Sequence, residues 1–164
     1  MIKLISFLGL VILSFPTWAE DKDAFVQGAA QGPMYVYQAE DDFDMLKEGV
    51  EVAITNLGLR VSGTLHVSEM LNRTGKDLGF EKKIYTKAES VEFCSAMISH
   101  KMTQTNPLNL GICPFTIALF IKPAEPETVY VSFRKIFLAG DNPALVTEIE
   151  NMLHGIVREA LDLE

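Results

Sequence analysis

The segment PFTIALFIKPAEPETVYVSFRKI, residues 114–136, decides the fold because it contains the two strongest strand patterns of the chain. Residues 114–121 and 128–136 are dominated by β-branched and aromatic side chains, which favour extended structure. Residues 122–127, with two prolines, predict the loop of a β-hairpin between these strands. Neighbouring strands joined by so short a loop pair antiparallel. The segment therefore predicts an antiparallel sheet.

The sequence before and after this segment alternates between strand and helix patterns. Apolar residues recur every three or four positions from Phe43 to Leu57, which predicts a helix that begins near Asp41 and buries one face. Asn142 followed by Pro143 is typical of a helix start and predicts a final helix. The other expected elements are strands at residues 34–39, 59–67 and 82–93, a short helix at residues 68–75 capped by Ser68, and a helix from about residue 94 to residues 105–107.

Apart from the short helix, the predicted order is strand, helix, strand, strand, helix, strand, strand, helix. Three helices with one apolar stripe each can cover one face of an antiparallel sheet. We therefore expect an α+β fold, a two-layer sandwich with a mostly antiparallel sheet and helices on one face. A chain of 164 residues with 48% hydrophobic residues suits a single domain of this kind, which we expect at residues 34–164.

Residues 1–19 have the pattern of a secretory signal peptide. Lys3 precedes an apolar run at residues 4–15, and small residues close the segment. The run is shorter than the roughly 20 apolar residues that a membrane span needs. We therefore expect a periplasmic or secreted protein without stable membrane insertion after cleavage. Residues 20–33, rich in glycine and alanine, are expected to form a flexible lead-in.

Charge and motifs exclude several classes of function. The net charge of −8 argues against a nucleic-acid partner, because phosphate binding needs a basic face. The sequence has no Ser–His–Asp order, no P-loop and no glycine pattern for dinucleotides. Because no set of catalytic residues converges, we lean towards a protein that is not an enzyme and expect no cofactor.

Three motifs resemble those of the domain-of-unknown-function 302 family: HVSEMLNRTGKDLG at residues 66–79, FCSAM at residues 93–97 and CPF at residues 113–115. The order of the predicted elements is similar too, and the resemblance spans residues 43–135. It implies a compact α+β domain that tends to associate as a dimer. The family has no agreed activity, so the resemblance transfers no catalytic residue.

Cys94 and Cys113 are the two cysteines of the chain. In an oxidising compartment we expect them to form a disulfide, which would stabilise the fold by about 3 kcal/mol. Two alternatives stay open. The thiols are buried and free, or they form a reactive pair in which the first turn of a helix activates Cys94. Relatives often combine cysteine and proline here, whereas Ser95 follows Cys94, so no role of a Cys-x-Pro turn is transferred.

A soft-metal site is the other hypothesis for residues 91–102, which contain Cys94, two methionines and His100. At about 100° per residue, a helix places Cys94 and Met97 on or beside its apolar face and His100 on the far side. A Cys–Met–His copper site on one helix therefore fails. Met97 and His100 lie about 60° apart on the helix and remain weak candidates for a metal at its edge.

The sequence thus favours an exported domain, stabilised by a disulfide, that binds a small apolar ligand or a partner protein, with a homodimer as one form of partner. We expect binding on the part of the sheet that helices leave uncovered. The alternative is a thiol-based redox or copper-handling protein centred on Cys94 and Cys113.

Overall fold

A computed structural model describes residues 28–163, so the predicted signal peptide and most of the predicted lead-in lie outside the described residues. The described residues form a six-stranded sheet in the order β1-β2-β6-β5-β4-β3, with antiparallel neighbours throughout. Its strands are β1 (Ala29–Gln31), β2 (Met34–Ala39), β3 (Arg60–Leu65), β4 (Lys87–Cys94), β5 (Phe115–Lys122) and β6 (Glu125–Arg134). The helices are α2 (Phe43–Asn56), α3 (Val67–Thr74), α4 (Ala96–Thr105), the 3₁₀ helix η1 (Pro107–Ile112) and α5 (Pro143–Ala160).

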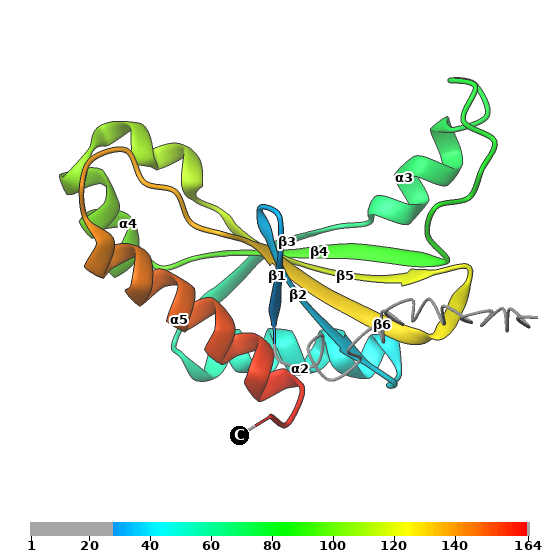
Figure 1. Ribbon diagram of the computed structural model, residues 1–164, viewed down its shortest axis with the longest axis horizontal. Helices are drawn as coiled ribbons and strands as arrows, with labels where there is room; N and C mark the ends of the chain where they lie inside the picture. Colours follow the sequence, from blue (N-terminus) through cyan, green and yellow to red (C-terminus); the bar gives the residue numbers. More distant parts are fainter. Residues whose placement is uncertain (1–27, 164) are drawn as a thin grey trace, which may run out of the picture.

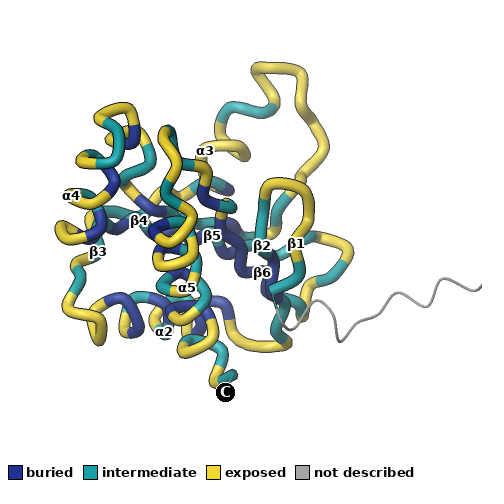
Figure 2. The backbone as a smooth tube through the Cα atoms, turned by 60° about the vertical axis from the view of Figure 1, so that its left-hand side comes forward, coloured by how far each residue is buried: buried dark blue, intermediate teal, exposed yellow. Residues whose placement is uncertain are grey.

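Two layers make up the core. Helices α2 and α5 pack on one face of the sheet, whereas α3 stands on the opposite side (Figure 1). Buried residues are concentrated in the sheet and along α2 and α5, and α3 with the loop after it is mostly exposed (Figure 2). This arrangement confirms the predicted α+β sandwich, with α3 as the helix that does not join the helical layer.

Side-chain caps fix the starts of three helices. The Asp42 carboxylate accepts hydrogen bonds from two backbone N–H groups in the first turn of α2, and the Ser95 hydroxyl accepts one in α4. Asn142 caps α5, with Pro143 as its first residue. Such caps satisfy N–H groups that have no partner inside the helix. The final helix therefore starts where the sequence predicts it.

Several boundaries differ from the prediction. The described end of the lead-in contains β1, which pairs with β2 and is too short to show a periodic pattern. The hairpin between β5 and β6 turns at Pro123 and Ala124 alone, because a register shift at residues 121–122 lets β6 begin at Glu125. The 3₁₀ helix η1 has no counterpart in the prediction.

The region around α3 differs most. Helix α3 begins at Val67 with His66 at the N-cap position, and Ser68 is buried in the first turn instead of capping it. Strand β4 begins at Lys87, so residues 82–86 belong to a loop and not to the predicted strand. The reason is pairing: β4 has ladder partners on β5 from Lys87 onward.

A partly buried pair of side chains joins β2 to α5. The Tyr37 hydroxyl lies 2.5 Å from Nδ1 of His154, and Tyr35 and Phe133 pack edge-on against the imidazole with ring centroids 4.5 and 4.9 Å away. Burial lowers the pKa of His154 below its ordinary 6.5, although the charge of Glu150 opposes the shift. The folded protein therefore favours the neutral imidazole.

We expect the free energy of unfolding to decrease as the pH falls below about 6.5. The unfolded chain, whose histidine has the ordinary pKa, then binds a proton more readily than the folded protein does. Urea denaturation at a series of pH values should show a shallower pH dependence for His154→Gln than for the wild type. His100→Gln, which removes an exposed histidine on α4, should keep the wild-type slope because His154 remains. An unchanged slope in His154→Gln would contradict this account.

Candidate functional site

The connection between β3 and β4 is far longer than their pairing requires. Adjacent antiparallel strands are usually joined by two to five residues, whereas residues 66–86 separate these two strands. We call residues 66–86 the arm; it consists of α3 and the loop that follows. The arm rises from the side of the sheet opposite α2 (Figure 1). Long connections in compact domains are often binding or catalytic segments, so the arm is the first candidate site.

Side-chain and backbone contacts fix the base of the arm. The Thr86 N–H donates to the Ile121 carbonyl at 2.8 Å, and Nδ1 of His66 lies 3.3 Å from the Glu89 carboxylate. Glu89 also forms an ion pair with Lys47 of α2 at 2.7 Å. Burial alone would raise the pKa of Glu89, but Lys47 and His66 together lower it. The carboxylate therefore stays charged and connects the arm to the helical layer.

The loop folds back onto the end of α3 through backbone contacts. The Phe80 N–H donates to the Gly75 carbonyl, and the Gly75 N–H donates to the Leu71 carbonyl, both at 2.8 Å. A Cβ atom at Gly75 would lie 2.8 Å from the Phe80 carbonyl oxygen, so this close approach needs glycine. Gly79, with φ of 79°, lets the chain reverse. These contacts hold the loop against α3.

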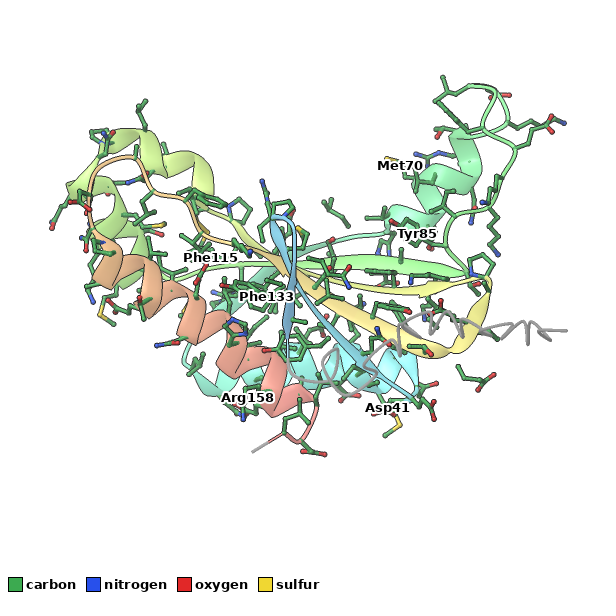
Figure 3. The ribbon with its side chains drawn as sticks, viewed as in Figure 1. Asp41, Met70, Tyr85, Phe115, Phe133 and Arg158 are labelled. Carbon is green, nitrogen blue, oxygen red and sulfur yellow. A yellow bond between two sulfur atoms is a disulfide. The ribbon has the colours of Figure 1, made fainter. Side chains whose placement is uncertain are left out.

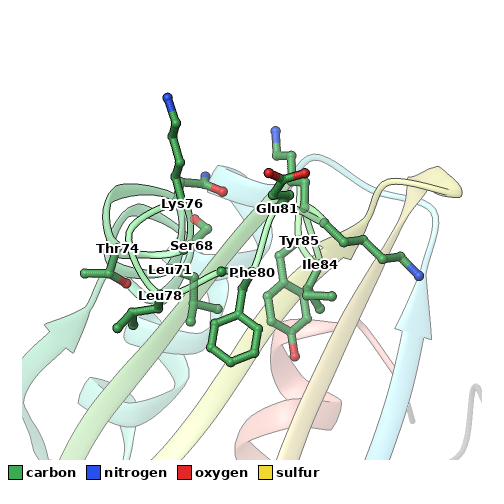
Figure 4. Close-up of a pocket in the computed structure, with 14 residues that line it drawn as sticks. Ser68, Leu71, Thr74, Lys76, Leu78, Phe80, Glu81, Ile84 and Tyr85 are labelled. Atoms are coloured by element: carbon green, nitrogen blue, oxygen red, sulfur yellow. The ribbon is translucent and has the colours of Figure 1, made fainter.

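The arm surrounds a partly open cavity of about 860 Å³. Small-molecule sites typically have volumes of about 300–1,000 Å³. Its apolar wall consists of Leu71, Leu78, Phe80, Ile84 and Tyr85. Figure 4 labels all five and shows them between α3 and the loop. Phe80 is 73% exposed and Leu78 is 66% exposed. Apolar side chains clustered in this way on a surface mark a binding site.

A row of aromatic rings continues from the cavity onto the sheet. The Tyr85 ring meets Phe120 of β5 edge-on at 5.3 Å between centroids, and Phe120 stacks on Tyr130 of β6 at 5.0 Å. Nζ of Lys122 lies 3.8 Å from the centroid of the Tyr130 ring. Figure 3 shows Tyr85 near the base of the arm, whereas Phe115 and Phe133 lie deeper in the molecule. The cavity therefore opens onto the sheet face that α2 and α5 leave uncovered.

Cys94 and Cys113 form a disulfide, with their Cα atoms 6.0 Å apart. Cys94 is the last residue of β4 and Ser95 caps α4, so Cys94 lies before the helix and not in its first turn. Cys113 follows η1 and directly precedes Pro114 and β5. The bond thus closes the segment that contains α4 and η1. Because β4 begins at the arm and ends at Cys94, the disulfide and the arm lie at opposite ends of this strand.

The two weak metal candidates lie on the surface of α4. Met97 is 65% exposed, which differs from its expected place beside the apolar face, and His100 is exposed. The helix starts after Cys94, and its buried side chains are Ile98 and Met102. Within residues 28–163, no group of three or more His, Cys, Asp or Glu side chains has the geometry to hold a metal ion. None of the helices in this range has the length and apolarity to cross a membrane.

A smaller cavity of about 200 Å³ lies beside η1, where Pro114, Arg134 and Phe137 line it. This volume is below the usual range of small-molecule sites. The arm is therefore the stronger candidate.

Replacing both cysteines, in Cys94→Ser/Cys113→Ser, should lower the free energy of unfolding by about 3 kcal/mol, because the unfolded chain then gains the entropy of an open loop. Urea denaturation measures the difference. The reduced wild type should match the double variant, and a reductant should leave the double variant unchanged. Equal stability of the oxidised wild type and the double variant would contradict a stabilising role for the disulfide.

Comparisons with known proteins place the chain in one family. The family model described as "Domain of unknown function DUF302" matches residues 35–160. The crystal structure of an uncharacterized conserved DUF302 protein from Bacillus stearothermophilus superposes with a TM-score of 0.62 at 16% identity, covering 79% of this chain and 99% of that chain. Identity this low demonstrates a shared fold alone. None of the curated proteins matches the sequence. Because the family model extends over most of the chain, the protein belongs to the DUF302 family.

Proposed function

We propose that this protein is an exported, non-enzymatic binding protein that holds a small apolar molecule in the cavity of the arm. The observation that carries the proposal is the exposed apolar wall of a cavity of about 860 Å³. Export rests on the signal-peptide pattern of residues 1–19. A ligand would cover side chains that water now surrounds, and full burial of one Leu or Phe side chain contributes about 1.5–3 kcal/mol.

The arm is arranged in advance for such a ligand. Backbone hydrogen bonds hold Phe80 and Gly75 together, and the Glu89 contacts fix the base of the arm. A site that is ordered before binding loses less conformational entropy when the ligand arrives. This geometry supports binding of a compact molecule without refolding of the arm.

The chemistry of the lining supports binding over catalysis. Among the described residues that line the cavity there is neither histidine nor cysteine, the side chains that most often act as base or nucleophile near neutral pH. The thiol-based alternative has less support from the geometry. Cys94 and Cys113 close the segment of α4, whose Ile98 and Met102 belong to the core, as a structural bond would.

A neutral, fluorescent apolar dye such as Nile red tests the proposed function. Phe80→Asp should weaken dye binding about tenfold or more, equivalent to about 1.4 kcal/mol, because a charge replaces part of the apolar wall. Gly75→Ala should weaken it too, since the added methyl group would push the Phe80 backbone away from α3. Leu108→Asp is the matched control, because Leu108 is 79% exposed on η1 and lies outside the cavity.

Wild-type affinity in Phe80→Asp, or an equal loss in Leu108→Asp, would overturn the proposal. A second copy of the chain is the other candidate occupant of the arm, which is the homodimer expected from the sequence. Light scattering, which measures the molar mass in solution, shows whether the wild type and the same variants are monomers or dimers. A wild-type dimer that Phe80→Asp converts to a monomer, without dye binding in either, would assign the arm to association.

A further inference from the structure

More positively than negatively charged residues line the cavity. Lys76, Lys82 and Lys83 line it together with one carboxylate, that of Glu81. This local excess of positive charge contrasts with the net charge of −8 of the whole chain. Lysines beside an apolar wall suit a ligand that combines a negative group with an apolar part, since their ammonium groups donate charge-assisted hydrogen bonds to oxygen anions.

Two of the charged side chains and most of the apolar ones extend toward different ends of the cavity. Lys76 and Glu81 extend from the outer end of the arm, whereas Phe80, Ile84 and Tyr85 extend toward the strands (Figure 4). The apolar end continues into the Tyr85–Phe120 contact on the sheet. A ligand would therefore place its charged group at the outer end and its apolar part between α3 and the loop.

From this polarity we infer that the ligand is a single-chain anionic amphiphile, a long-chain carboxylate bound as one molecule. The inference rests on the proposed function and adds the ligand class. The carboxylate lies at the outer end of the cavity, on the side of Lys76, and the hydrocarbon chain covers Leu71 and Phe80 and ends near Tyr85. The volume of about 860 Å³ suits a molecule of this size and far exceeds what an inorganic anion needs.

The shape of the site favours one molecule over a membrane surface. The apolar side chains line a hollow between α3 and the loop. A hollow encloses a single hydrocarbon chain from several sides, so each methylene group leaves water. Affinity should then rise about threefold to fourfold for each methylene group that the cavity covers.

Displacement of the neutral dye from the wild-type protein by dodecanoate, dodecanol and dodecylammonium, each below its micelle concentration, tests the inference. Dodecanoate should bind about tenfold more tightly than dodecanol, because each exposed ion pair with a lysine multiplies the affinity by a factor of roughly 1.4 to 5. Dodecylammonium should bind more weakly than dodecanol. Decanoate should bind about tenfold more weakly than dodecanoate, and added salt should reduce the preference for the carboxylate.

Two charge variants give the matched comparison. Lys76→Gln/Lys82→Gln/Lys83→Gln should remove the preference for dodecanoate over dodecanol. Glu81→Gln should raise the affinity for dodecanoate, since it removes the opposing carboxylate. All four side chains are exposed, so the substitutions should not disturb the fold.

The outcomes separate the inference from the function on which it rests. Equal binding of dodecanoate and dodecanol, or an unchanged preference in the triple variant, would overturn the ligand class and leave an apolar binding site standing. Failure of both compounds to displace the bound dye would overturn the inference, and absence of dye binding to the wild type would overturn both. Binding to vesicles of anionic phospholipid without binding of monomeric dodecanoate would overturn the inference in favour of a membrane surface.

Discussion

The antiparallel pairing of β3 with β4 determines where the arm projects from the sheet. Leu65 pairs with Ser90 and Arg60 with Cys94, so β3 is paired with the second half of β4, with a bulge between Val61 and Gly63. The arm leaves the sheet after Leu65 and re-enters it at Lys87, three residues before Ser90, so most of its residues are not needed to connect the two strands. Because the ladder holds their ends together, the arm can project from the sheet and still have a fixed base.

Strand β4 connects the arm to the buried core of the molecule. The side chains of Val91 and Phe93 are completely buried against the helical layer, whereas the buried residue of α3 is Ser68 alone. Regions with few buried contacts open at lower free energy than the core. A rigid sheet with an exposed apolar arm is therefore stable without a ligand, and the part that a ligand would cover contributes little to folding.

Much of this architecture can be predicted from the sequence, because periodic patterns and caps are local. The strand at residues 34–39 and the start of α5 at Asn142 are found where they are expected. Strand β1 and η1 were not predicted, because they are defined by strand pairing and tertiary packing and show no local sequence pattern. The position of Cys94 relative to the helix start depends on the Ser95 cap, which the apolar spacing does not reveal.

The arm is the region where the prediction from sequence differs most from the structure. Ile84 and Tyr85 resemble the alternating residues of a strand, and the sequence therefore extends the strand to residue 82. Whether such residues enter the core or line an open cavity depends on where pairing with β5 begins, at Lys87. A usable signal was the motif at residues 66–79, which lies entirely in the arm and contains Gly75 and Gly79. Glycines at a close backbone approach and at a positive φ indicate a built turn.

The most direct test of the account is paramagnetic broadening of backbone amide signals by dodecanoate that carries a nitroxide at its chain end. We predict strong broadening within residues 68–85, greatest near Tyr85, where the apolar end of the cavity meets the sheet. Broadening centred on Pro114 and Phe137 beside the smaller cavity, or spread evenly over the molecule, would contradict a ligand site in the arm.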